Sequence, residues 1–151
     1  MKPAPKDWPR FASVVVYQDA HAAIDWLCRA FSFQIRIKVV AEDGSVEHSE
    51  LEYGEGLIMV AQEDPQADKA WKRALRSPRS VDGAMTQSLM FFVDDADQHC
   101  ADARNAGAQI VVEPMTQDYG EDYWSDRSYA AIDPEGHLWW IVQRLRTGSA
   151  N

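Results

Sequence analysis

The sequence predicts an α+β fold of two tandem βαβββ modules, and three observations support this expectation. The segment from Gln87 to Ile110 repeats the segment from Ala12 to Ile35 at a fixed offset of 75 residues, without a gap. Each copy has an apolar strand, an Asp that can cap a helix, an amphipathic stretch and a Gln-Ile pair. Further strands and turn signals follow each copy. We therefore expect two copies of one supersecondary unit, whose mixed sheets curve around a cleft that holds the functional site.

The first βαβββ module is expected over residues 11–62. Its helix should begin after Asp19, a residue type that caps helix N-termini, and apolar residues recur at helical spacing from Ile24 to Phe31. Asp43-Gly44 and Gly54-Glu55-Gly56 are turn signals between strands. The four predicted strands are Ser13–Gln18, Gln34–Ala41, Val46–Tyr53 and Leu57–Gln62.

A polar connector over residues 63–85, with a short helix within Ala67–Arg76, should lead to the second module at residues 86–145. The second helix should follow Asp94 and Asp95 and end near Ala106, because Gly107 can adopt the left-handed conformation that ends helices. Ser32 takes the equivalent place in the first module. The remaining predicted elements are strands Thr86–Val93, Gln109–Glu113, Arg127–Ile132 and His137–Arg144, an aromatic-rich loop at Pro114–Asp126, and a type I turn at Asp133–Gly136.

The charge distribution limits the classes of partner. The net charge is −9, with nine acidic residues and no Lys or Arg from Glu42 to Asp68, and five basic residues from Lys69 to Ser80. An acidic protein repels nucleic acid and anionic membrane surfaces, so we expect neither as a partner. No signal peptide and no membrane-spanning run is recognisable, and Cys28 and Cys100 are expected as reduced thiols, which favours a cytoplasmic protein.

Two stretches of the second module resemble a known superfamily. One runs from Phe91 to Asp97 and continues to Ala106-Gly107-Ala108, and the other joins Asp118-Tyr119-Gly120 to Asp133-Pro134-Glu135-Gly136-His137-Leu138-Trp139. With the tandem βαβββ pattern, they resemble the vicinal oxygen chelate superfamily, which includes glyoxalase I, bleomycin resistance proteins and extradiol dioxygenases. The resemblance covers about residues 11–145. It implies the glyoxalase-like fold, but the superfamily hosts many chemistries.

The resemblance also identifies where a metal would bind. Metal-dependent members place ligands on the first and fourth strand of each module, which corresponds here to Ala12, Met59 or Val60, Gln87 and Trp140. A divalent site needs three or four nitrogen, oxygen or sulfur donors, and only Gln87 could supply one. We therefore expect no metal at the usual place and no other cofactor.

Candidate catalytic residues lie on the third strand. His48 and Glu50 share one face of it, because side chains alternate along a strand. A His beside a carboxylate can act as a general base, or the pair can bind a metal at a non-standard position. The alternative interpretation is a polar, exposed edge.

Candidate ligand-binding residues come from the second module. Trp139 and Trp140 should point to opposite faces of the last strand, with Trp140 towards the cleft. Gln87 would either bind a ligand or bond neighbouring backbone, and Arg127 would either bind a ligand or pair with Asp122 or Asp126. The loop aromatics Tyr119, Tyr123 and Trp124 could form a lid.

Two functions from different classes follow. The first is a glyoxalase/bleomycin-resistance-like protein that binds a small planar organic ligand in an aromatic-lined cleft without the usual metal. The alternative is a lyase or isomerase of the same superfamily that uses His48 and Glu50, with a non-standard metal or none. A third possibility is a cleft filled by the protein's own side chains. The resemblance further implies a homodimer.

Overall fold

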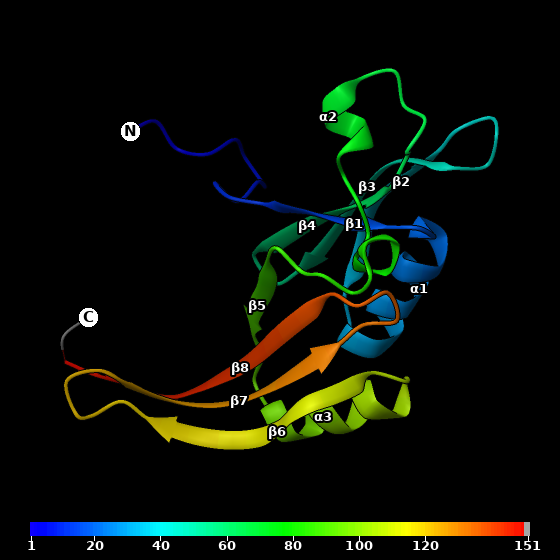
Figure 1. Cartoon of the computed structure of the whole chain (residues 1–151). Coiled ribbons are helices and arrows are strands. Elements are labelled where there is room, and N and C mark those ends of the chain that lie inside the picture. Colours follow the sequence, from blue (N-terminus) through cyan, green and yellow to red (C-terminus); the bar gives the residue numbers. More distant parts are fainter. Residues whose placement is uncertain (150–151) are drawn as a thin grey trace. The chain divides into compact units, whose positions relative to one another are not determined.

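The computed structural model describes residues 1–149, and the chain divides into two compact units, unit 1 at residues 1–83 and unit 2 from Ala84 onward (Figure 1). Each unit contains one βαβββ module with a mixed four-stranded sheet, so the predicted α+β fold is confirmed. No helix within residues 1–149 combines the length and the hydropathy needed to cross a bilayer.

Unit 1 consists of β1 (Ser13–Tyr17), α1 (Ala20–Phe31), β2 (Gln34–Val40), β3 (Val46–Tyr53) and β4 (Gly56–Gln62), as the sequence predicts to within a few residues. The strand order is β1-β4-β3-β2, in which β1 runs parallel to β4 and the other neighbours are antiparallel. The core lies between the sheet and α1, where Val15, Ile24, Leu27 and Leu51 are fully buried.

The two ends of α1 follow from single residues. Asp19 accepts a hydrogen bond from the backbone nitrogen of Ala22 at 3.0 Å and so satisfies one of the free N–H groups at the start of the helix. Ser32 ends the helix in the left-handed conformation, with φ 61°, as its alignment with Gly107 predicts. A side chain at such a position is strained, and Gly107 at φ 93° avoids that strain in unit 2.

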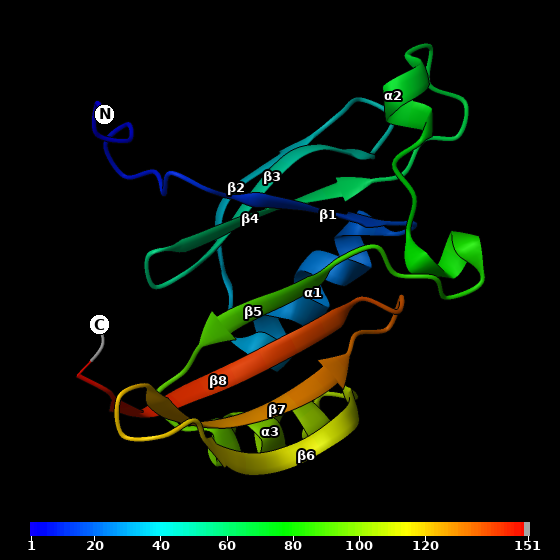
Figure 2. The ribbon, with the colours of Figure 1, turned by 60° about the vertical axis from the view of Figure 1, so that its left-hand side comes forward.

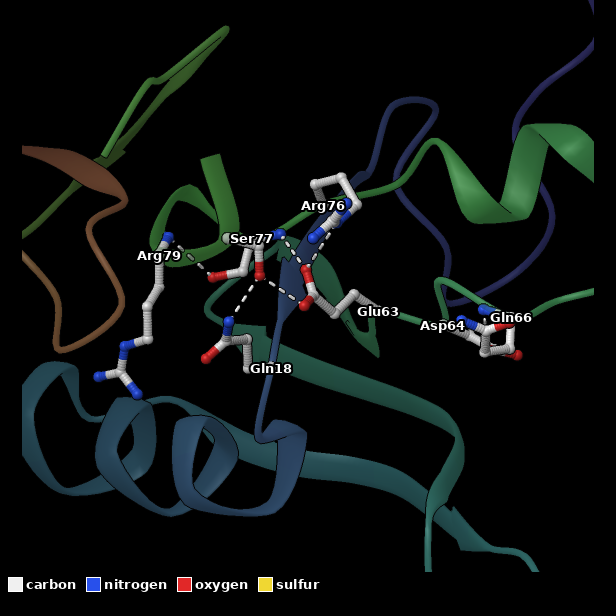
Figure 3. A network of polar contacts seen from close by, with 8 residues as sticks. Gln18, Glu63, Asp64, Gln66, Arg76, Ser77 and Arg79 are labelled. Carbon is white, nitrogen blue, oxygen red and sulfur yellow. Dashed lines mark hydrogen bonds and ion pairs between the residues drawn. The ribbon is translucent and has the colours of Figure 1, made fainter. Parts of the chain in front are cut away.

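The carboxylate of Glu63, the first residue of the connector, holds the later part of the connector close to the end of β4, and Gln18 Nε2 donates to Ser80 Oγ at 2.6 Å (Figure 3). Glu63 accepts hydrogen bonds from Ser80 Oγ at 2.5 Å, Ser77 N at 2.9 Å and Arg76 Nε at 3.2 Å. Burial raises the pKa of Glu63, but these three bonds together outweigh it and hold the pKa below its usual value. The connector contains α2 (Ala70–Arg73), within the range predicted for a short helix. It also contains a 3₁₀ turn, η1 (Pro78–Val81), and this turn was not predicted from the sequence.

Unit 2 consists of β5 (Ser88–Phe92), α3 (Ala96–Asn105), β6 (Gln109–Asp118), β7 (Trp124–Ile132) and β8 (Leu138–Thr147). It has the equivalent strand order, β5-β8-β7-β6, with α3 against one face of the sheet (Figure 2). Ser88 begins β5 where Ser13 begins β1, and Gln109 begins β6 where Gln34 begins β2, so the predicted offset of 75 residues is confirmed in the strands themselves.

The predicted loop at residues 114–126 is wrong, because most of it belongs to a long β6–β7 hairpin. Strand β6 continues past Pro114 to Asp118, and pairing with β7 resumes at Met115 after an irregularity. Proline is tolerated here because β6 is an edge strand and the pairing shifts at that point. Only Tyr119–Tyr123 form the connecting turn.

Candidate functional site

His48 and Glu50 lie together on β3, as their spacing predicts. They alternate with the buried residues Ser49 and Leu51, so their side chains lie on the sheet face opposite α1. His48 Nε2 is 2.9 Å from Glu50 Oε1, within hydrogen-bond distance. The His48 side chain is 44% exposed and that of Glu50 only 4%. A solvent-accessible imidazole is thus oriented by a buried carboxylate, which is a suitable arrangement for a general base.

The second carboxylate oxygen of Glu50 is held by a different cation. Arg36, in β2, places Nε at 3.4 Å from Glu50 Oε2, and this buried oxygen accepts no hydrogen bond within residues 1–149. Arg36 also donates from Nη1 to the backbone oxygen of Asp7 at 2.6 Å, and its guanidinium lies 5.0 Å from the ring centre of Trp8. Arg36 could not be predicted from the sequence, because the irregular β2–β3 register that positions it is a property of the paired strands.

Within unit 1, residues 7–9 of the N-terminal segment and strands β2, β3 and β4 line a pocket of about 380 Å³ next to this group. It is lined by Asp7, Trp8, Arg36, Glu52 and Leu57, together with the β3–β4 turn at Gly54–Gly56. This pocket could not be predicted from the sequence, because no local pattern shows that residues 7–9 fold back against β2 and β3.

In unit 2, Trp139 and Trp140 point to opposite faces of β8, as predicted. Trp139 is 1% exposed, packs edge-on against Phe91 and donates from Nε1 to Asp133 Oδ2 at 3.1 Å. Phe91 in turn contacts His99 of α3, so Trp139 faces the helix. Trp140 is half-buried on the face opposite α3, and its indole N–H has no protein acceptor within residues 1–149.

The face of the unit 2 sheet opposite α3 carries several exposed apolar side chains. Met90, paired with Trp140 across β5 and β8, is 57% exposed, and Phe92 is 47% exposed. Arg144 lies between Phe92 and Trp124, with its guanidinium 5.2 and 5.4 Å from the two ring centres. We call Met90, Phe92, Trp124, Trp140 and Arg144 the aromatic face.

The predicted loop aromatics extend this set at the tip of the β6–β7 hairpin. Tyr119 and Tyr123 lie 5.6 and 6.1 Å from the Trp124 ring, measured between ring centres, and both tyrosines are more than half exposed. Asp118 fixes the turn by accepting bonds from Gly120 N at 2.8 Å and Arg146 at 2.7 Å, and these two bonds lower the pKa of Asp118. The three aromatic rings are therefore held as one cluster.

Arg127 and Gln87 do not belong to the aromatic face. Arg127 forms a two-pronged ion pair with Asp97 of α3, at 2.5 and 2.7 Å, which lowers the pKa of Asp97. It therefore faces the helix, and the predicted partners Asp122 and Asp126 are wrong, since Asp126 pairs with Arg144. Gln87 is exposed and precedes β5, on the side of the strand that Leu89 and Phe91 share.

The residues at the superfamily's usual ligand positions do not fit a divalent metal. Val60 is buried on the α1 side, so Met59 is the β4 residue on the opposite face. Ala12, Met59, Gln87 and Trp140 supply one amide and one thioether, short of the three or four donors required. Within residues 1–149, no group of three or more His, Cys, Asp or Glu residues is arranged to hold an ion.

Two mixed four-stranded sheets, each with one helix against one face and repeated in tandem, define an α+β protein of the glyoxalase-like class. The chain belongs to the Glyoxalase/Bleomycin resistance protein/Dioxygenase superfamily, whose family model matches residues 10–141.

Known relatives share this fold over most of the chain. The crystal structure of TioX from Micromonospora sp. ML1 is 28% identical, covers 91% of this chain and 99% of its own, and has a TM-score of 0.67. A superfamily member from Sphaerobacter thermophilus is 15% identical, with a TM-score of 0.64 over 87% of this chain and 94% of its own. An uncharacterized protein of Mycobacterium bovis is 29% identical over 138 residues, 91% of this chain and 85% of the relative.

Proposed function

We propose that this protein binds a small planar organic ligand by stacking on Trp140, without a metal at the superfamily's usual position. The observation that supports this most is the placement of Trp140, on the sheet face opposite α3 beside the exposed Met90. Its ring presents an apolar surface, and its indole N–H is available to a ligand acceptor.

The surroundings of Trp140 suit a planar ligand that carries no strong negative charge. The guanidinium of Arg144 is paired with Asp126, Nε to Oδ1 at 2.5 Å, and is flanked by two rings, so its charge is already compensated. The protein as a whole is acidic, with a net charge of −9. Stacking then supplies most of the affinity, and the electrostatic potential favours neutral or cationic rings.

The experiment that tests this proposal is a titration of two planar fluorescent probes, proflavine as a cation and 9-anthracenecarboxylate as an anion. The anisotropy of the probe is followed, since six tryptophans would obscure protein emission. We expect proflavine to bind more tightly, and Trp140→Ala to weaken it by about tenfold or more, through lost stacking and lost buried area.

Trp71 provides the matched control, because it is 64% exposed in α2, a helix that buries none of its residues. Trp71→Ala should leave proflavine affinity unchanged. The proposal is wrong if Trp140→Ala binds proflavine as well as the wild type does, or if it only lowers the melting temperature.

A second candidate function is a lyase or isomerase that uses His48 and Glu50. The hydrogen bond between them, with Glu50 buried and held by Arg36, favours it. A general base of this kind should remove a proton next to a carbonyl group. Deuterium exchange into hydroxyacetone in D₂O, followed by proton NMR, should be faster with the wild type than with His48→Gln. Equal rates would exclude this activity for that substrate class.

We also propose that the protein is a homodimer. Edge strand β2 exposes four β-branched side chains, Ile35, Ile37, Val39 and Val40, each 41–49% exposed. Such an edge is prone to pair with another chain. Sedimentation velocity at micromolar concentration should give twice the monomer mass of 17.1 kDa, and a single species at the monomer mass would disprove the dimer.

A further inference from the structure

We infer that the pocket between the N-terminal segment and strands β2, β3 and β4 of unit 1 is a second binding site, specific for a small organic cation with an apolar body. It is separate from the aromatic face, since all of its lining residues belong to unit 1. Its volume of about 380 Å³ falls in the range of pockets that hold small molecules.

The charge of the pocket favours a cation. Three carboxylates, Asp7, Glu52 and Glu55, line it, and none of them forms an ion pair within residues 1–149. Arg36 is the one basic residue in the lining. A single arginine can neutralise at most one of these three carboxylates.

Arg36 is not available to the pocket carboxylates, because its charge compensates the buried Glu50. Glu50 Oε2 accepts no hydrogen bond within residues 1–149, and Arg36 Nε, at 3.4 Å, is the cation beside it. Removing Arg36 from this oxygen would leave a buried carboxylate uncompensated, which is costly. Arg36 is further fixed by its bond to the Asp7 backbone and by the Trp8 ring. The pocket therefore retains an excess of negative charge.

The shape of the pocket and the apolar part of its lining determine what the uncharged body of the ligand should be. Leu57 is 6% exposed and forms part of the wall, and the half-buried Trp8 and Pro9 face it from the N-terminal segment. A hydrated inorganic cation gains nothing from these groups. A primary ammonium on a short aromatic or aliphatic body can place its charge between Glu52 and Glu55 and bury its carbon atoms against Trp8 and Leu57.

Three ligands of similar shape test the inference by isothermal titration calorimetry of the full chain. They are 2-phenylethylammonium, the neutral 2-phenylethanol and the anionic 3-phenylpropionate. We expect affinity to fall in that order and the binding of the cation to weaken as salt is added. Amide signals of Gly54 and Gly56, which line the pocket, should shift on titration, and that of Gly136 in unit 2 should not.

A matched pair of variants locates the charge effect. Glu52→Gln with Glu55→Gln should weaken 2-phenylethylammonium about five- to tenfold and leave 2-phenylethanol unchanged. The control changes net charge equally at two exposed positions elsewhere, Glu42→Gln with Glu121→Gln, and should have no effect. Trp8→Leu should weaken both ligands.

The inference is overturned by any of three results. One is no binding of the cation at millimolar concentration, and another is equal affinity for the cation and the alcohol. The third is a set of shifts at Met90 and Phe92 in place of Gly54 and Gly56. The titration is repeated with Trp140→Ala, which should bind 2-phenylethylammonium normally, so that failure of this site and failure of the proposed aromatic-face function are told apart.

Discussion

Replacing Asp133 by Ala should destabilise unit 2 strongly, although Asp133 belongs to neither candidate site. Asp133 is only 4% exposed, and its carboxylate accepts hydrogen bonds from four donors. Oδ1 accepts from the backbone nitrogens of Glu135, Gly136 and His137, each at 3.0 Å, and Oδ2 accepts from Trp139 Nε1 at 3.1 Å. One side chain thus closes the β7–β8 turn and orients the largest side chain of the core.

The magnitude follows from the buried hydrogen bonds that the substitution removes. Gly136 N retains the Asp133 backbone oxygen at 3.0 Å, so the bonds lost outright are those donated by Glu135 N, His137 N and Trp139 Nε1, and all three residues are buried. An unsatisfied buried donor costs about 1–3 kcal/mol, and neighbouring losses are not additive, so we expect about 3–5 kcal/mol. That is a large part of the roughly 5–15 kcal/mol that stabilises a typical domain.

Asp133→Asn separates the two halves of this network. One oxygen remains for the backbone N–H groups, but the amide NH₂ then faces the indole N–H of Trp139, so the cost should be about 1–3 kcal/mol. In a Trp139→Phe background that indole donor is absent, and the cost of Asp133→Asn should be smaller by about 1 kcal/mol.

Urea unfolding followed by far-ultraviolet circular dichroism measures these differences. Asp43→Ala is the control, because Asp43 accepts bonds from Ser45 in an exposed hairpin turn, and its removal should change the midpoint far less. The reasoning fails if Asp133→Ala costs less than about 1 kcal/mol, or if the cost of Asp133→Asn is the same with and without Trp139.

Three further outcomes are expected. Asp19→Ala should lower the free energy of unfolding by about 1 kcal/mol through loss of the α1 cap, measured by urea denaturation. Ser32→Gly should raise it by about 0.5–1 kcal/mol, because glycine tolerates the left-handed conformation, and a loss of stability would contradict this. Because the pKa of Glu63 is lowered in the folded protein, its carboxylate stabilises the folded connector fully above the unfolded pKa. This stabilisation is lost as the pH falls through the folded pKa. Proteolysis of the connector near Ser77 should accelerate in acid, and Glu63→Gln should be cleaved rapidly at every pH.

The order of elements in this protein is determined locally and was readable from the sequence. The 75-residue repeat is visible directly as a sequence pattern. Local backbone preferences are enough to predict the helix caps at Asp19 and Asp95 and the turn at Asp133–Gly136, because each depends on residues close in the chain. Strand alternation likewise sufficed to place His48 beside Glu50 and to separate Trp139 from Trp140.

Only the tertiary structure decided which distant groups meet. Alternation places Arg127 and Asp126 on opposite faces of β7, but only the packing of α3 against one face brings Asp97 to Arg127, and only the pairing of β7 with β8 brings Arg144 to Asp126. The N-terminal segment folds against Arg36, and Glu50 fixes that arginine, through contacts between residues far apart in sequence. The sequence offers several oppositely charged partners for each charged side chain. Packing and burial select one of them, and no local pattern records that choice.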